Sequence, residues 1–263
     1  MEYLIRAKQQ PESGCRLEHL DFRVHVLKPG EVIEGRSGEN EVGITILYGL
    51  CDIAVGELVS GTGTLYEGAG GRTSASPGPS PHVALIPPGF GYSVTALTEA
   101  KFSVSATKAG GGLNEVIHVP SGTVAGARRG TGKTERTIYD LIPDGVDTKL
   151  MIFEVFTPEG NWSSFPPHKH DEDGEDERLL EEVYLFHFDP PEGFALVWLF
   201  DDSGELDEAY AVKDGDLELI PRGYHTMAVS PGFTCATHAV MAGPTNEWKV
   251  KFKEEYRRLY DWD

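Results

Sequence analysis

The stretch Phe165-Pro-Pro-His168-Lys-His170 places two histidines two positions apart in a run that predicts a β-strand. Because side chains alternate along a strand, both imidazoles point to the same side of the sheet. A dozen residues later, Glu182-Val-Tyr-Leu-Phe-His-Phe188 is rich in β-forming residues and predicts the next strand. His225 follows a Pro-x-Gly turn after a further predicted strand, residues 217–220. Three imidazoles and one carboxylate from adjacent strands predict a first-row divalent metal site with positions open to other ligands.

Composition indicates the class of protein around this site. The chain has 263 residues, of which 40% are hydrophobic, and it contains 31 glycines and 17 prolines. A chain of this length forms one large or two small domains with a substantial core. So many turn-forming residues are typical of short strands joined by tight turns. We therefore predict an all-β fold.

The same composition excludes several partners. A formal net charge of −19 disfavours nucleic acid and anionic membranes, because both attract clustered lysine and arginine. No apolar run approaches the roughly 20 residues of a membrane-spanning helix, and the N-terminus lacks the apolar core of a signal peptide. Cys15, Cys51 and Cys235 are odd in number and far apart, which fits a reducing compartment. We expect a cytoplasmic protein with no nucleic-acid or membrane partner.

Two strings occur in both halves of the chain. Residues 41–47 correspond to residues 182–188, and Leu85-Ile-Pro-Pro-Gly-Phe-Gly91 corresponds to Leu219-Ile-Pro-Arg-Gly-Tyr-His225. The first copy ends in Gly91 where the second has His225, and no His-x-His pair precedes Glu41. We predict a duplicated unit that keeps its metal site only in the second copy.

Three local expectations complete this outline. In the first half, the strand Glu41–Tyr48 should end in a turn at Gly49, and residues 60–81 should form an irregular loop. The tail from residue 246 to 260 should form a short helix that covers a barrel or a subunit contact. One face of that helix would carry an aromatic and apolar stripe of Trp248, Phe252, Tyr256 and Leu259.

The metal-site residues also carry a family resemblance. His-x-His, a downstream Glu and the segment Gly215-x5-Pro221-x-Gly223-x-His225 resemble the motifs of the cupin superfamily. The longer string from Thr157 to Asp171 is similar to bacterial 5-deoxy-glucuronate isomerases, enzymes of inositol breakdown, and Arg129-Gly-x-Gly supports that likeness. The resemblance implies two cupin-type antiparallel β-barrels (a bicupin). We expect a metal-free barrel in residues 1–112 and a metal-binding barrel in residues 113–263.

The resemblance also implies an activity. It predicts a metal-dependent aldose–ketose isomerase, an intramolecular oxidoreductase, that converts 5-deoxy-D-glucuronate to 2-deoxy-5-keto-D-gluconate in myo-inositol degradation. The ligands of one divalent ion, Zn, Mn, Fe or Ni, would be His168, His170, Glu182 and His225. Glu181 competes with Glu182, but Val183-Tyr184 follows Glu182 directly, as in the family's Glu-Val/Ile-Tyr pattern. Two alternatives stay open: a cupin dioxygenase that uses Fe or Mn, and a bicupin that binds a sugar acid without turning it over.

Residues around the metal supply the remaining candidates. Tyr184 shares a strand face with Glu182 and could shuttle the proton, although packing in the core explains it equally well. A sugar-acid substrate also needs a cation for its carboxylate. The candidates are Arg222 beside the His225 turn, Arg128 and Arg129 in a basic loop, and Lys169, which alternates away from the metal face. We also expect a homo-oligomer.

One segment departs from these patterns. From Asp171 to Glu182 the chain has eight acidic residues and one arginine. The segment lacks the regular spacing of a calcium-binding loop. A cation-binding loop is one interpretation, but a solvated, mobile insertion that repels itself is the simpler one.

Overall fold

The computed structural model describes residues 3–6, 12–57, 63–75 and 78–259. The described helices are two short 3-10 segments, η1 (Gly132–Thr134) and η2 (Glu254–Leu259), and strands make up the regular structure of both halves. The predicted all-β class is therefore confirmed. Among the described residues, no helix has the length and hydrophobicity that crossing a membrane would require.

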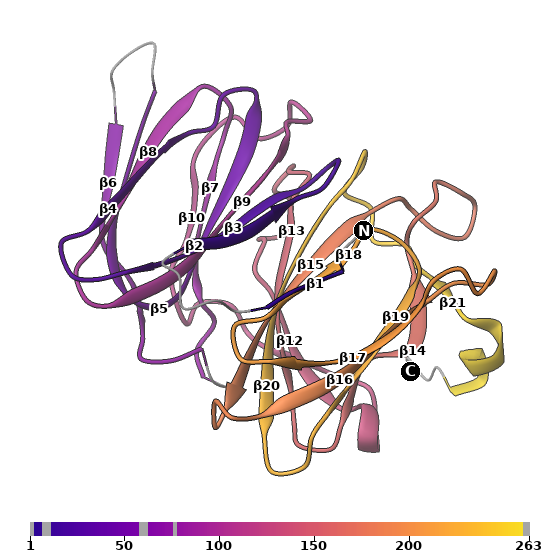
Figure 1. Ribbon diagram of the computed structural model, residues 1–263. Coiled ribbons are helices and arrows are strands. Elements are labelled where there is room, and N and C mark those ends of the chain that lie inside the picture. The colour runs from indigo at the N-terminus through magenta and orange to yellow at the C-terminus, as the bar shows by residue number, and fades with distance from the viewer. Residues whose placement is uncertain (1–2, 7–11, 58–62, 76–77, 260–263) are drawn as a thin grey trace. The chain divides into compact units, whose positions relative to one another are not determined.

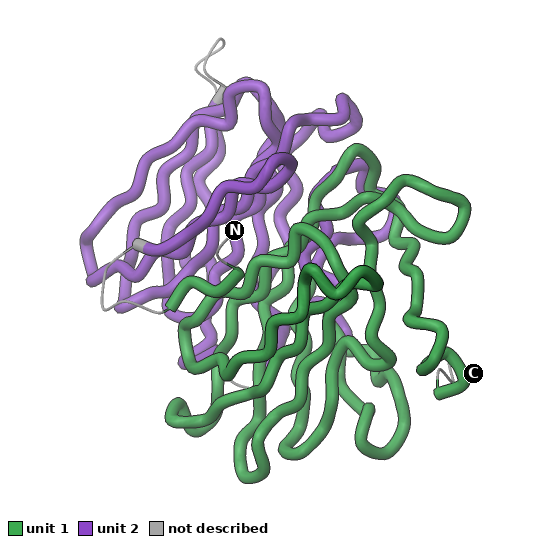
Figure 2. Tube along the Cα trace, turned by 45° about the vertical axis from the view of Figure 1, so that its right-hand side comes forward, with its two compact units in different colours: residues 1–7, 126–139, 153–263 green, residues 8–125, 140–152 purple. Residues whose placement is uncertain are grey.

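The chain forms two compact units that interleave along the sequence (Figure 2). Unit 1 contains residues 1–7, 126–139 and 153–263, and unit 2 contains residues 8–125 and 140–152. The boundary predicted after residue 112 thus falls inside unit 2. The assignment of each barrel to one continuous half of the chain stays a prediction.

Unit 2 is organised around one long strand, β5 (Asn40–Glu57) (Figure 1). Its first part pairs with β7 (His82–Ile86) and β9 (Ala100–Lys108). Its second part pairs with β6 (Gly63–Arg72) and β8 (Phe90–Ala96). The other strands of this unit are β2 (Glu12–Arg16), β3 (Asp21–Leu27), β4 (Val32–Arg36) and β10 (Ile117–Val119). Because β5 belongs to both groups of strands, its apolar side chains contribute to one continuous core.

The turn predicted at Gly49 is wrong. Gly49 lies inside β5 with φ of 88°, and the strand continues through it to Glu57. The pairing register shifts on both sides of this residue. Positive φ and a bulge bend a strand without reversing it, and this bend lets β5 join two groups of strands.

The irregular loop predicted for residues 60–81 is also wrong in part. Residues 63–72 form β6, which pairs with β5. Most of β6 is exposed on both faces, so its sequence lacks the alternation that would reveal a strand. Residues 60–62 and 76–77 of the predicted loop lie outside the described residues.

Unit 1 contains two antiparallel sheets with an apolar core of residues from both. The first has seven strands in the order β1-β18-β15-β20-β13-β12-β11. They are β1 (Leu4–Ile5), β18 (Leu217–Ile220), β15 (Glu181–Asp189), β20 (Thr234–Ala242), β13 (Met151–Thr157), β12 (Arg136–Asp140) and β11 (Ala127–Arg129). The second has five strands in the order β17-β16-β19-β14-β21. They are β17 (Asp207–Lys213), β16 (Phe194–Phe200), β19 (Tyr224–Val229), β14 (Trp162–Lys169) and β21 (Lys251–Phe252).

The predicted C-terminal helix is present but shorter than expected. Within the described part of this tail, residues 254–259 are helical, as η2, whereas Lys251 and Phe252 pair with the end of β14. The helical spacing of the aromatic residues did not decide the backbone conformation, because pairing with β14 satisfies backbone groups that the strand edge would otherwise expose. The aromatic residues therefore do not form one helical stripe.

Replacement of Gly49 by alanine tests the bend in β5. We expect a loss of about 3 kcal/mol or more in the free energy of unfolding, measured with urea. A positive φ costs alanine about 1–2 kcal/mol, and the new Cβ would lie 2.3 Å from the Glu99 carbonyl oxygen. The matched control is Gly38→Ala, since Gly38 has φ of 59° but no atom within 4 Å of the added Cβ. Equal losses in the two variants would contradict the close approach at Gly49.

Candidate metal centre

The four predicted ligands come together inside unit 1. His168 lies near the end of β14, His170 follows that strand, and His225 lies on the neighbouring β19, directly paired with His168. Glu182 lies on β15, in the other sheet. All four side chains are buried. One ligand atom from each of the three histidines lies within 4.8 Å of the others.

Backbone carbonyls orient all three imidazoles. The Nδ1 atom of His170 lies 2.8 Å from the Leu180 carbonyl oxygen, that of His168 lies 3.3 Å from Pro166 O, and that of His225 lies 3.5 Å from Gly223 O. A carbonyl oxygen only accepts, so Nδ1 carries the proton in each ring. Each neutral ring therefore keeps a lone pair on Nε2, and hydrogen bonds of this kind commonly orient metal-binding histidines.

The carboxylate of Glu182 faces two of these lone pairs. Its Oε2 atom lies 3.2 Å from Nε2 of His170 and 3.4 Å from Nε2 of His225. Since Nδ1 of His170 already donates, a hydrogen bond to Glu182 would require a doubly protonated ring. The Nε2 atom of His225 is buried and has no hydrogen-bond partner among the described residues. Lone pairs that face one another in a buried site call for a cation, so these residues fit a divalent metal ion.

Burial and charge keep two of the rings neutral. Burial, together with the nearby His170, lowers the pKa of His168 to about 3. Burial and the other two histidines hold the pKa of His225 well below its ordinary value. Burial also acts to lower the pKa of His170, but the hydrogen bond and charge of Glu182 outweigh it and leave that pKa raised. The environment of His170 and Glu182 therefore favours a positive charge at that position. Imidazole binds metal in its neutral form, so a bound metal ion would supply that charge in place of a proton.

Two aromatic residues that the sequence assigned to a helix lie against this cluster. The ring centroid of Trp248 lies 5.9 Å from that of His168 and 5.8 Å from that of His170. Phe252 lies 5.8 Å from His168, centroid to centroid. Trp248 is 48% exposed. Sequence analysis missed both as site residues, because their contact depends on the pairing of β21 with β14.

Tyr184 faces the same interior. Its hydroxyl oxygen lies 2.9 Å from Ser164 Oγ, and its ring centroid lies 6.1 Å from that of His225. Burial, followed by the charge of Glu182, raises the pKa of Tyr184 well above its ordinary value. The phenol therefore remains protonated and can donate a hydrogen bond.

Glu218 is a second interior group, and sequence analysis missed it. It pairs with Tyr184 across β15 and β18, is 2% exposed, and accepts a hydrogen bond of 3.1 Å from the Tyr210 hydroxyl. Burial and the charge of Glu182 raise its pKa to about 8, although the Tyr210 hydrogen bond opposes them. Glu218 therefore carries a proton near neutral pH. The sequence feature that could have indicated this buried glutamate is its position within the otherwise apolar strand β18.

The predicted carboxylate-binding residues have other ionic partners. Arg222 is half exposed and lies 3.4 Å from Asp201, while Arg128 is exposed and pairs with Glu135. Arg129 is exposed on β11. Lys169 is buried, as its alternation implies, and its ammonium contacts three carboxylates of the acidic segment. Arg136 is a buried cation whose charge contributes to the low pKa of His168.

Residues 172–176 of the acidic segment are exposed, as the solvated interpretation expects, but Glu177 is buried. The Glu177 side chain is only 4% exposed and lies 2.8 Å from the Lys169 ammonium. Asp171, Glu172 and Glu177 form a second group whose oxygens lie close enough to hold a cation. The Lys169 ammonium occupies that position.

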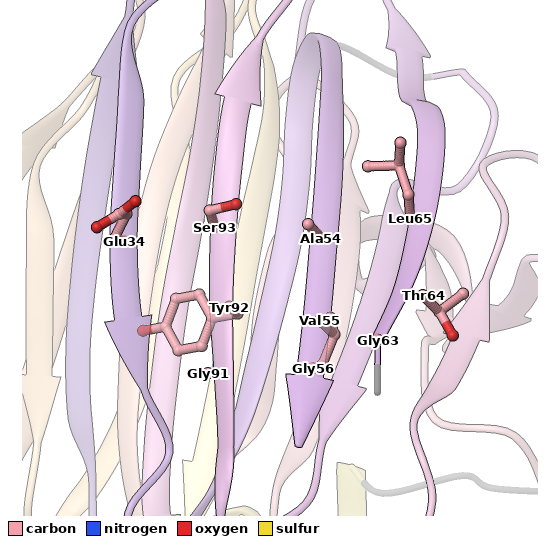
Figure 3. Close-up of a pocket in the computed structure, with 10 residues that line it drawn as sticks. All are labelled: Glu34, Ala54, Val55, Gly56, Gly63, Thr64, Leu65, Gly91, Tyr92 and Ser93. Carbon is pink, nitrogen blue, oxygen red and sulfur yellow. The ribbon is translucent and has the colours of Figure 1, made fainter. Parts of the chain in front are cut away.

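In unit 2, the residues that align with His225 and Glu182 in the repeated strings, Gly91 and Glu41, have different surroundings. Gly91 lines an open pocket of about 480 Å³, and the residues drawn around it include one carboxylate and no histidine or cysteine (Figure 3). The Glu41 carboxylate accepts hydrogen bonds from Thr148 Oγ1 at 2.5 Å and from the Lys149 amide at 3.0 Å. Those donors satisfy the carboxylate without a metal. The metal-free first barrel stays a prediction.

Comparisons with known proteins all indicate the same family. A model of the KduI/IolB family matches residues 4–259. A 5-deoxy-glucuronate isomerase from Geobacillus kaustophilus is 34% identical over 234 residues, which cover 88% of this chain and 82% of that protein. Another from Bacillus subtilis strain 168 is 29% identical over 266 residues, which cover 95% of each.

Solved structures agree on the fold. The crystal structure of an IolB-like protein from Salmonella typhimurium LT2 has a TM-score of 0.90 at 29% identity, covering 98% of this chain and 99% of that one. Oxalate decarboxylase from Bacillus subtilis has a TM-score of 0.61 at 12% identity, covering 93% and 74%. Such low identity carries the fold alone, and that likeness confirms the predicted bicupin architecture.

A conservative change distinguishes the two neighbouring glutamates. We expect Glu182→Gln to weaken zinc binding at least about 100-fold, because the amide cannot supply the anionic ligand. Glu181→Gln is the matched control, since successive side chains on β15 point to opposite faces. Zinc affinity is measured by competition with a chromogenic chelator. Unchanged affinity in Glu182→Gln, or an equal loss in both variants, would contradict the assignment of Glu182.

Proposed function

The chain belongs to the KduI/IolB family, and from this membership we propose that it is a metal-dependent 5-deoxy-glucuronate isomerase. The reaction would convert 5-deoxy-D-glucuronate to 2-deoxy-5-keto-D-gluconate, moving hydrogen between C2 and C1. The observation that carries the proposal is that ring nitrogens of His168, His170 and His225 lie within 4.8 Å of one another, with the Glu182 carboxylate beside two of them. That site occurs in a chain whose relatives carry the name of this isomerase.

The proposed ligands of one divalent ion are Nε2 of His168, His170 and His225 and a carboxylate oxygen of Glu182. When bound, the ion would act as a Lewis acid that stabilises negative charge on the sugar oxygens at C1 and C2. Imidazole and carboxylate ligands suit Zn, Mn, Fe and Ni alike, so the metal's identity is a matter for experiment. The backbone carbonyls behind the rings hold the Nε2 atoms in place before binding.

Tyr184 is the proposed proton carrier. Its phenol is protonated, and Ser164 fixes its orientation. A hydroxyl held this close to the cluster can donate to a sugar oxygen while hydrogen moves between the two carbons. Glu218, which is paired with Tyr184 across the strands and protonated near neutral pH, lies in the same interior and is a candidate proton reserve.

Two further features would receive the rest of the sugar acid. Arg136 is buried and its charge reaches His168, so it is our proposed partner for the substrate carboxylate. Trp248 and Phe252 would exclude water from one side of the bound sugar.

The proposed homo-oligomer is supported by Trp162, Phe194 and Leu196, which are exposed on strands of the same sheet. A cytoplasmic location stays a prediction.

Incubation of the purified protein with 5-deoxy-D-glucuronate tests the reaction. We expect the aldehyde signal to be replaced by a ketone signal in the NMR spectrum, under anaerobic conditions and without added nucleotide or flavin. A chelator should abolish turnover and a divalent ion should restore it. Oxygen consumption in step with substrate would reject isomerisation in favour of a dioxygenase. Binding without conversion would favour a sugar-acid-binding protein.

Removal of one hydroxyl tests the proton carrier. Tyr184→Phe should lower kcat about 10²–10⁴-fold, the usual contribution of a positioned acid or base. Its zinc affinity should match that of the wild type, since Tyr184 is not a proposed ligand. Tyr210→Phe removes a partly buried hydroxyl from the same unit and should cost much less activity. If Tyr184→Phe keeps nearly full kcat, the residue serves only in packing.

A further inference from the structure

Lys169, between the two histidines of the His-x-His pair, is the centre of a buried ionic network. Its ammonium lies 2.5 Å from Asp171 Oδ1, 2.8 Å from Glu177 Oε1 and 3.4 Å from Glu172 Oε1. The side chains of Lys169 and Glu177 are 8% and 4% exposed, whereas Glu172 is 74% exposed. The strong contacts are therefore those with Asp171 and Glu177. Charge pairs shielded from water retain more of their interaction than surface pairs do.

Asp171 connects this network to the third histidine. Its second oxygen, Oδ2, accepts a hydrogen bond of 2.7 Å from the Gly223 amide, 52 positions along the chain. The carbonyl of Gly223 lies beside Nδ1 of His225. One carboxylate thus joins the β14 end that carries His168 and His170 to the turn that orients His225.

The turn that Asp171 holds requires a glycine. Gly223 has φ of 93°, and a Cβ there would lie 2.8 Å from a Leu206 side-chain atom and 2.9 Å from the Phe200 carbonyl oxygen. Because glycine leaves the backbone free to adopt other conformations, the hydrogen bond to Asp171 is a specific restraint on this turn. A shift of Asp171 would move or release the turn that leads into His225.

Glu177 closes the network on the other side. Its Oε2 atom accepts a hydrogen bond of 3.3 Å from the Asp171 amide. Beyond it, the Leu180 amide donates to the His170 carbonyl at 2.8 Å, and the Leu180 carbonyl receives the His170 Nδ1 proton. The acidic segment therefore returns to His170 and fixes both its backbone and its ring.

We propose that Asp171 is a positioning residue of the metal centre, which acts with Lys169 and Glu177 to set the spacing between the His168/His170 pair and His225. The three Nε2 atoms would then be arranged before metal binds, and metal affinity would depend on a carboxylate that does not touch the metal. The inference rests on the proposed function only through the metal, not through the sugar acid.

Cobalt binding tests this role, because Co²⁺ reports coordination geometry through its visible absorption. We expect Asp171→Ala to bind Co²⁺ about 10–100-fold more weakly than the wild type and to change the absorption spectrum. Asp171→Asn retains an oxygen that can accept from Gly223, so it should recover the wild-type spectrum more closely. The matched control is Asp176→Ala, which removes an exposed acidic residue of the same segment and should leave both readouts unchanged.

Circular dichroism of each metal-free variant verifies that it folds. If Asp171→Ala does not fold, Glu177→Gln provides the same test, because it weakens the hold on Lys169 and Asp171 without removing volume. A folded Asp171→Ala protein with unchanged Co²⁺ affinity and spectrum would overturn the proposal. So would an equal loss in Asp176→Ala, which would indicate a general effect of charge. If the wild type binds Co²⁺ but does not convert the sugar acid, the reaction is wrong and the binding data still decide the positioning role.

Discussion

Ring nitrogens of three buried imidazoles and the Glu182 carboxylate come together in the interior of unit 1. Such an arrangement is unfavourable unless a cation lies between them, because burial removes the water that would otherwise solvate each group. In the surroundings as they stand, only His170 among the three rings has a raised pKa, because it lies beside Glu182. The three Nδ1 protons are directed to backbone carbonyls, and the low pKa values of His168 and His225 oppose protonation of those rings. The negative charge of Glu182 would be neutralised by a divalent metal ion bound among these side chains.

The fold supports this arrangement in two layers. Pairing of β14 with β19 brings His168 opposite His225, and the facing sheet supplies Glu182. That pairing fixes where the backbone runs but leaves the turn before His225 to be held separately. Asp171 does so through the Gly223 amide, while Lys169 and Glu177 hold Asp171. One buried ammonium pairs with the inner carboxylates of an acidic stretch that would repel itself in isolation.

Alternation in strands was enough to predict that the three histidines and Glu182 come together. His168 and His170 share a face, as do Glu182 and Tyr184, and Lys169 does point the other way. Contacts between distant segments could not be predicted. Nothing local indicates that Asp171 reaches Gly223, or that Trp248 lies against His168, since both depend on how loops pack after the sheets form. Local sequence also gave the wrong backbone conformation in two places. Gly49 predicts a turn but bends a continuous strand. Trp248 and Phe252 have helical spacing, but the chain at Phe252 pairs with β14 instead.

The two units show how one strand plan can serve two purposes. Both present a glutamate at the start of a strand that follows an equivalent sequence pattern, Glu41 in unit 2 and Glu182 in unit 1. Around Glu182 the neighbours are imidazole nitrogens with free lone pairs, which compete for a cation. Around Glu41 they are the Thr148 hydroxyl and the Lys149 amide, which donate protons. A carboxylate surrounded by donors is already stabilised and gains little from a metal, whereas one surrounded by acceptors is not. We therefore attribute the predicted difference between a structural barrel and a metal-binding one to the donors and acceptors placed around one glutamate, and not to the barrel itself.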